Sequence, residues 1–210
     1  MAHLVWDWNG TLLDDLWLVV EATNASLAVC GGGPVTAEEH RRDFRRPIIE
    51  YYAGVLGRAV DAEEFSRLDK AFHETYRTGL HRCALTVDAM EAVAAWSGTQ
   101  SLLSMWFHDE LVPTVDRYGL STRLSRVDGL RGHVNGMPKA PFLASHLAEQ
   151  GLSGGDCVLI GDSIDDADAA AAVGARVVLY AGGFTDEARL RATGHPVARS
   201  LSEAITLAVR

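Results

Sequence analysis

Cysteines, long apolar runs and excess positive charge are all scarce in this chain of 210 residues. The three cysteines, Cys30, Cys83 and Cys157, are far apart and form no Cys-x-x-Cys pair. This spacing and the odd number argue against a disulfide framework or a cysteine zinc site, and they fit a reducing compartment. We see neither a leader-like segment nor an apolar run long enough to cross a bilayer. We therefore expect a cytoplasmic protein without a membrane partner.

The charge balance is acidic, with 28 Asp and Glu against 19 Lys and Arg and a net charge of -9. An acidic balance argues against a general nucleic-acid binder, which needs a basic surface. With 48% hydrophobic residues, the chain can bury a good core as one domain with an insertion or as two small domains. We expect a monomer or a homodimer.

Helix signals dominate the stretch 15–84. A helix is expected from Asp15 to Cys30, where the breaker Gly31-Gly32-Gly33-Pro34 follows. Two further helix starts are predicted where a capping residue precedes a glutamate by three positions, at Thr36 and Asp61. The second of these helices carries apolar and aromatic residues at helical spacing, which we interpret as core packing: Phe65, Leu68, Phe72 and Tyr76.

Helices and strands alternate after residue 86. A helix ending at Gly98 is expected to bury Val87, Met90, Val93 and Ala94 on one face. Buried strands are predicted at 4–6, 102–107, 157–160 and 177–180, and helices at 139–150, 166–173 and after Ser200. The predicted fold is α/β, with a Rossmann-like parallel sheet core at 1–14 and 85–210 and an inserted α-helical domain at 15–84.

Two aspartates follow buried strands of the predicted sheet. Asp7 follows the apolar run at 4–6, and Asp162 follows the strand at 157–160. Parallel strands end at the same edge of a sheet, where such folds bind ligands. Two carboxylates there repel each other unless a cation lies between them, and oxygen ligands of this kind suit Mg²⁺. A plain Asn-Gly turn after Asp7 is the alternative interpretation.

Other polar residues have weaker individual signals. Ser104 lies near the end of a predicted strand and could donate to a phosphate oxygen, or only satisfy a backbone carbonyl. Lys139 begins a predicted helix and could hold carboxylates and a phosphate together, or lie on the surface. Asp168, and in one interpretation Asp165, are only acidic residues that stabilise a helix start.

The order of these residues is more specific than any one of them. With the segments Asp7-Trp8-Asn9-Gly10-Thr11-Leu12 and Gly161-Asp162-Ser163-Ile164-Asp165-Asp166 around Ser104 and Lys139, the chain resembles the haloacid dehalogenase superfamily. It is most similar to the phosphoglycolate-phosphatase-like branch, which inserts a helical cap after the first strand. The resemblance implies a phosphatase that acts on a small phosphorylated substrate with Mg²⁺ as cofactor.

The resemblance also implies a role for each matching residue. Asp7 would attack phosphorus to give an aspartyl-phosphate, and Asp7, Asp162 and the backbone carbonyl of Asn9 would bind Mg²⁺. Ser104 and Lys139 would hold the phosphoryl oxygens. Asp166 would steady Lys139 or a metal-bound water, and Thr11 would orient the nucleophile loop.

Asn9 departs from the pattern, because phosphatases of this family carry a second aspartate there as general acid and base. An amide cannot do this work, which is commonly worth about two to four orders of magnitude in rate. Four interpretations follow: a slow phosphatase or one for good leaving groups, a phosphonatase-like hydrolase of C–P bonds, a non-catalytic phosphometabolite-binding or regulatory protein, or an engineered or deamidating position. The phosphonatase-like reaction needs a cap lysine, and the cap offers only Lys70.

Substrate contacts are expected from the cap and from the loops that face it. In the basic cluster at 40–46, Arg45 and Arg46 are candidates to grip an anionic leaving group, whereas Arg41 and Arg42 fit a solvated face. The cap is expected to close on hinges near 13–15 and 83–86. His108 is also a candidate substitute acid. The other predicted substrate contacts are Trp8, Gly10, Met105 and Trp106.

Overall fold

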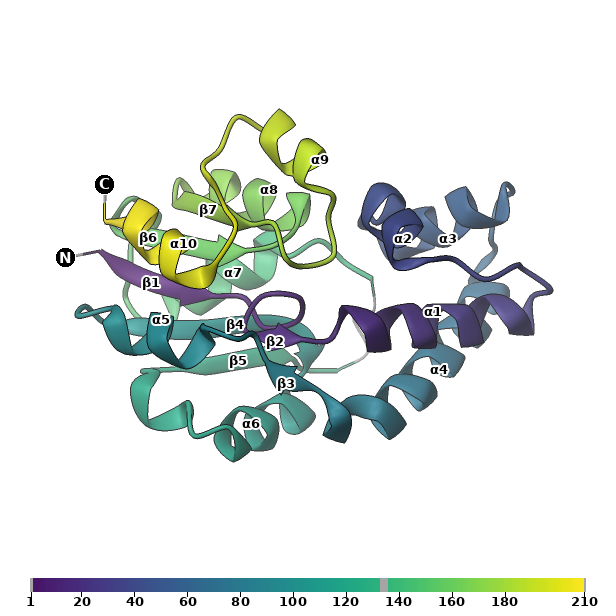
Figure 1. Ribbon diagram of the computed structural model, residues 1–210, viewed down its shortest axis with the longest axis horizontal. Coiled ribbons are helices and arrows are strands. Elements are labelled where there is room, and N and C mark those ends of the chain that lie inside the picture. Colours follow the sequence, from purple (N-terminus) through teal and green to yellow (C-terminus); the bar gives the residue numbers. More distant parts are fainter. Residues whose placement is uncertain (1, 133–135, 210) are drawn as a thin grey trace.

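The computed structural model describes residues 2–132 and 136–209. Its main sheet has six parallel strands in the order β5-β4-β1-β6-β7-β8, so that β1 lies between β4 and β6 (Figure 1). The strands are β1 (His3–Trp6), β4 (Gln100–Phe107), β5 (Val127–Leu130), β6 (Cys157–Gly161), β7 (Arg176–Tyr180) and β8 (Val197–Ala198). The predicted α/β architecture with a parallel sheet is confirmed.

Helices cover both faces of this sheet. Leu4 and Trp6 of β1 join one buried apolar cluster and Val5 joins the other, because successive side chains of a strand point to opposite faces. The cluster of Leu4 and Trp6 includes residues of α5 (Ala89–Ala95), α6 (His108–Arg117) and α10 (Leu201–Ala208). The cluster of Val5 includes residues of α7 (Ala140–Ala148), α8 (Ile164–Val173) and α9 (Glu187–Ala192). Strands covered on both faces favour apolar residues, which explains the apolar runs within β1, β4, β6 and β7.

Four helices lie together to one side of the sheet and form the cap (Figure 1). They are α1 (Leu16–Val29), α2 (Ala37–Asp43), α3 (Ile48–Leu56) and α4 (Ala62–Gly79). The chain enters and leaves the cap through two short antiparallel strands, β2 (Leu13–Asp14) and β3 (Ala84–Leu85). Both predicted domain boundaries and both predicted hinges fall on or beside this ribbon.

Local capping explains several helix starts. The side chains of Thr36, Asp61 and Ser200 each accept the backbone N–H three residues further on, and the helix starts predicted at these three positions are confirmed. The predicted buried face of the helix before Gly98 is wrong in part. Val87 is fully exposed and precedes α5, because residues 86–89 form a turn. Met90 and Ala94 are also exposed, so of the predicted face only Val93 is buried, and α5 buries Ala89 and Ala92 with it.

Among the described residues, no helix is both long enough and apolar enough to span a membrane.

Candidate active site

Three buried carboxylates converge at the carboxyl end of the central strands. Trp6 of β1 pairs with Ile160 of β6, so Asp7 and Asp162 leave the sheet side by side. Asp166 lies in the first turn of α8, where the Ser163 hydroxyl and backbone N–H donate to it at 2.6 and 3.0 Å. One oxygen from each of the three aspartates lies within 4.8 Å of the other two.

Lys139 supplies the positive charge of this cluster. Its ammonium donates to Asp7 at 2.5 Å and to Asp166 at 2.6 Å, and its side chain is 1% exposed. Burial alone would lower the pKa of Lys139, but the charges of Asp166 and Asp7 raise it well above its usual value, so the lysine is charged. The lysine neutralises one of three carboxylates and leaves excess negative charge in a buried site.

Burial, together with neighbouring carboxylates, raises the pKa values of Asp7 and Asp162. Burial raises the pKa of Asp7 to about 6 despite the lysine. Burial and the charges of Asp7 and Asp166 raise the pKa of Asp162 well above its usual value. Clustered oxygen ligands with excess negative charge suit a hard divalent cation such as Mg²⁺. The donor set therefore fits the metal that the sequence predicts.

The loop after β1 packs Gly10 and Thr11 closely against Asp162. Gly10 has φ +72°, and a Cβ there would lie 2.5 Å from Oδ2 of Asp162, so glycine is required. The Thr11 hydroxyl lies 3.1 Å from Asp162 Oδ1 and 3.5 Å from Asp7 Oδ2. The backbone N–H of Phe184 also donates to Asp162, at 2.5 Å. Thr11 thus ties the two strand-end aspartates together.

Asn9 is held by a network that uses both ends of its amide. Its Nδ2 donates to Asp15 Oδ2 at 2.9 Å and to the Tyr76 hydroxyl at 2.8 Å. Its Oδ1 accepts from the Ser104 hydroxyl at 3.0 Å. The Tyr76 hydroxyl donates in turn to Asp15 at 2.5 Å. Burial raises the pKa of Asp15 to about 6, and this carboxyl is fully enclosed. Asn9 is therefore the neutral partner of a buried aspartate.

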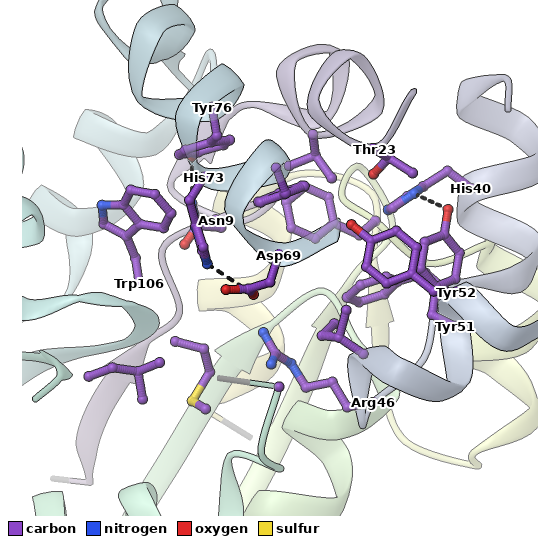
Figure 2. Close-up of a pocket in the computed structure, with 18 of the residues that line it drawn as sticks. Asn9, Thr23, His40, Arg46, Tyr51, Tyr52, Asp69, His73, Tyr76 and Trp106 are labelled. Carbon is purple, nitrogen blue, oxygen red and sulfur yellow. Dashed lines mark hydrogen bonds and ion pairs between the residues drawn. The ribbon is translucent and has the colours of Figure 1, made fainter. Parts of the chain in front are cut away.

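Two adjoining cavities open at this site, between the core and the cap. The smaller one, about 40 Å³, is lined by Asp7, Lys139, Asp162 and Asp166. The larger one, about 130 Å³, is lined mainly by apolar and aromatic side chains (Figure 2). Five residues line both cavities: Asn9, Phe44, Arg46, Met105 and Phe184. A polar compartment thus adjoins an apolar one.

The predicted substrate contacts divide into two groups. Arg46 and Met105 line both cavities, and Trp106 lines the larger one. Nε of Arg46 lies 3.3 Å from Oδ2 of Asp165, so this arginine joins the cap to the core. Arg45 is exposed and donates to the carbonyl of Asp43 within the cap, and it lines neither cavity.

Trp8, Gly10 and His108 also lie outside the lining of these two cavities. The Trp8 carbonyl accepts from two later backbone N–H groups of the turn, and its side chain, 1% exposed, packs 6.0 Å from the Tyr118 ring in the core. Gly10 contributes backbone geometry. Nδ1 of His108 accepts the Gly129 N–H at 3.2 Å, which engages that ring within the core. The geometry does not favour a substrate contact for any of the three.

Several site residues were interpreted otherwise from the sequence. Tyr76 is buried as expected, but its hydroxyl holds Asn9 and Asp15, so core packing is an incomplete description. Arg41 is not simply solvated, because its guanidinium donates to the carbonyls of Gly182 and Gly183 at 2.9 and 2.8 Å. The acidic pair Asp14-Asp15 directly after the Asp7 motif was the visible signal that we did not use.

Asp165 does more than stabilise the start of α8. It accepts the backbone N–H of Lys139 at 3.1 Å while it pairs with Arg46. It therefore fixes the position of Lys139 from one side and anchors the cap from the other.

Comparison with known proteins agrees with the fold. Residues 134–204, which include Lys139, Asp162 and Asp166, match a family model described as HAD-hydrolase-like. A phosphoglycolate phosphatase from Mesorhizobium japonicum is 26% identical over 193 residues, which cover 87% of this chain and 84% of that protein.

Solved structures extend the likeness to the cap. A haloacid dehalogenase-like hydrolase from Streptococcus pneumoniae aligns with a TM-score of 0.83 at 15% identity and covers 99% of this chain and 98% of its own. A predicted phosphatase from Clostridium acetobutylicum aligns with a TM-score of 0.84 at 13% identity, with the same coverage. The chain has a haloacid dehalogenase-like fold with a helical insertion.

Proposed function

We propose that this protein is a Mg²⁺-dependent phosphatase that transfers the phosphoryl group of a small phosphate ester to Asp7 and then to water. The observation that carries the proposal is the buried cluster in which Lys139 binds Asp7 and Asp166 beside Asp162. A phosphoglycolate phosphatase shares about a quarter of its sequence, and a predicted phosphatase shares its fold.

Asp7 would act as the nucleophile, so that an aspartyl-phosphate forms as the ester bond to the leaving alcohol breaks. Lys139 would neutralise phosphoryl oxygens while it holds Asp7 in place, and Thr11 would keep the carboxylate oriented. Asp7, Asp162 and the backbone carbonyl of Asn9 would hold Mg²⁺, which when bound neutralises charge on the phosphoryl group. Covalent catalysis divides one difficult displacement into two easier ones.

Asn9 sets the expected rate. Its amide has no proton to give to a leaving alkoxide and cannot activate water against the aspartyl-phosphate. Both of its polar atoms are moreover engaged by Asp15, Tyr76 and Ser104. We therefore propose slow turnover, with a preference for esters whose alcohol leaves without a proton.

A non-catalytic phosphometabolite-binding protein is the second candidate, and the closed network around Asn9 favours it. A phosphonatase-like reaction is disfavoured by the position of the cap lysine. Lys70 and Lys139 are the two lysines of the sequence, and Lys70 is 76% exposed on α4, 3.9 Å from Glu74. It does not line either cavity described above.

Phosphate release from a panel of phosphorylated metabolites and from an activated aryl phosphate tests the proposal. We expect Mg²⁺-dependent release by the native protein, loss of release in Asp7→Ala, and unchanged release in Asp168→Asn. The last variant is a matched control, because Asp168 is exposed on α8 two residues from Asp166. Release that persists in Asp7→Ala would refute the phosphatase. An inactive native protein that gains activity only as Asn9→Asp would favour the binding protein.

A further inference from the structure

We infer that the larger cavity binds an uncharged leaving group the size of a single ring, so that the substrates are phosphate esters of aromatic or similarly apolar alcohols. This inference rests on the proposed function, because it assigns the other half of that substrate. It separates this chain from a phosphatase for phosphoglycolate, whose leaving group carries a carboxylate.

The position of the cavity makes it the site for the leaving group. Asn9, Arg46 and Met105 belong to the walls of both cavities, so the two spaces adjoin at these residues. A phosphoryl group held beside Asp7 and Lys139 in the smaller space would therefore point its ester oxygen toward the larger one. The alcohol portion then lies between the core and the cap.

The walls of the larger cavity suit an aromatic ring. Core and cap both contribute aromatic side chains, and the rings of Tyr76 and Trp106 lie 4.6 Å apart across the domain boundary. The aromatic wall residues are Phe44, Tyr51, Tyr52, Phe72, Tyr76, Trp106, Phe107 and Phe184. The volume of about 130 Å³ is close to that of an apolar cavity known to bind benzene, which is about 150 Å³. One ring fits this space.

The charges on the wall disfavour an anion. Among the described wall residues, Arg46 and Asp69 carry formal charges, and Figure 2 shows both side chains directed into the same hollow. Arg46 is already paired with Asp165, and Asp69 lies 3.3 Å from Nε2 of His73. Burial lowers the pKa of His40 to about 4, so this wall histidine is neutral near pH 7. A carboxylate on the leaving group would lose its hydration among aromatic side chains and lie next to the carboxylate of Asp69, which disfavours it.

Three residues of the same wall contain buried neutral nitrogen atoms. Within the described part of the chain, Nε2 of His40, Nδ1 of His73 and Nε1 of Trp106 are buried without a hydrogen-bond partner. Buried polar atoms without partners are costly, so a small rotation of one of these rings toward a hydroxyl or carbonyl of a bound ligand would be favourable. The cavity therefore suits a neutral ring that carries a polar substituent.

Binding of phosphonates, whose P–C bond a phosphatase does not cleave, tests the inference without any turnover. Calorimetry with the native protein and Mg²⁺ would compare methylphosphonate, benzylphosphonate and 3-phosphonopropionate, which mimics phosphoglycolate. We expect benzylphosphonate to bind at least about tenfold more tightly than either of the other two. Benzylphosphonate should also bind more tightly than its 4-carboxy derivative.

Variants of the cavity wall test whether the tighter binding of benzylphosphonate comes from the larger cavity. Val19 lines it, so Val19→Phe should fill the space and abolish the advantage of the benzyl group while methylphosphonate still binds. Val112→Phe, at a 37% exposed position on α6, is the matched control. Should Val19→Phe lose its native circular dichroism, Asp69→Asn gives an independent measurement, because it should narrow the gap between benzylphosphonate and its 4-carboxy derivative.

The outcomes distinguish this inference from the proposed function. If methylphosphonate and inorganic phosphate fail to bind with Mg²⁺, the phosphoryl site itself is wrong and the proposed function fails. If methylphosphonate binds but benzylphosphonate gains nothing, or 3-phosphonopropionate binds most tightly, only the assignment of the larger cavity is overturned.

Discussion

If the proposed slow phosphatase activity is correct, exchange of the buried pair Asn9 and Asp15 should raise the rate without loss of stability. Asn9→Asp alone places a second carboxylate against Asp15, at the present amide-to-carboxylate distance of 2.9 Å. At this distance two full charges repel by about 6 kcal/mol with an effective dielectric constant of about 20.

In Asn9→Asp, protonation of Asp15 costs less free energy than the repulsion between two charged carboxylates. The pKa of Asp15 is about 6, so its protonation at pH 7 costs about 1.4 kcal/mol. We therefore expect Asn9→Asp to lower the free energy of unfolding by roughly 2–4 kcal/mol at pH 7, between these two bounds. The loss should shrink at pH 5.5, where Asp15 is mostly protonated.

The double variant Asn9→Asp with Asp15→Asn restores one amide and one carboxylate in reversed positions. The new amide at position 15 can accept the Gly10 N–H and donate to the new carboxylate at position 9, while Tyr76 stays within reach of both. We expect its free energy of unfolding to return to within about 1 kcal/mol of the native value. The restored acid and base should raise turnover of an alkyl phosphate by roughly 100-fold or more, and that of an activated aryl phosphate much less.

Urea denaturation and steady-state kinetics of the native protein, both single variants and the double variant form a complete cycle. A coupling energy near zero would refute the proposed contact between positions 9 and 15. A stable double variant whose activity toward alkyl phosphates stays at the native level would refute the assignment of slow turnover to Asn9.

Three further perturbations test the charges and burial of the site. Lys139→Met leaves Asp7 and Asp166 without their cation, so urea denaturation should show a free energy of unfolding lower by about 3–5 kcal/mol. The decrease should be smaller with saturating Mg²⁺, and an equal decrease with and without the metal would contradict the account. Mg²⁺ at ten times its Kd should stabilise the native protein and Asp168→Asn by about 1.4 kcal/mol, whereas the same stabilisation of Asp162→Asn would argue against the metal site. Because the pKa of His40 is about 4 in the folded protein and 6.5 when unperturbed, acid favours unfolding: its contribution is complete above pH 6.5 and is lost as the pH falls toward 4. At pH 5 the titration of His40 should lower the free energy of unfolding by about 2 kcal/mol, and His40→Gln should lack this loss. An identical pH dependence of stability in the native protein and in His40→Gln would refute this role of His40.

The sequence predicted the parts of the fold that depend on local patterns. The apolar runs of β1, β4, β6 and β7 and the capping residues Thr36, Asp61 and Ser200 each act over a few residues, so their signals were visible. β5 was missed because Asp128 and Gly129 interrupt its apolar character. Asp128 is nevertheless buried, because it pairs with His146 at 2.7 Å, and no local pattern reveals such a partner.

The site was predictable where it follows strand ends and not where it depends on the cap. Asp7 and Asp162 are brought together by adjacent parallel strands, which a pattern of strands can indicate. Tyr76 reaches Asn9 across 67 positions of sequence, and its helical spacing is the same as that of a core residue. Trp8 was misplaced because the turn that follows it returns its side chain to the core.

The phosphorylation state of Asp7 during turnover tests the central claim most directly. Because Asn9 cannot activate water, hydrolysis of the aspartyl-phosphate should be slower than its formation, and phosphate should accumulate on the protein. Rapid acid quench with a ³²P-labelled aryl phosphate and Mg²⁺, followed by peptide mapping, should find label on Asp7 and a matching burst of released phenol. Turnover with no label on Asp7, or with label on another residue, would contradict the account.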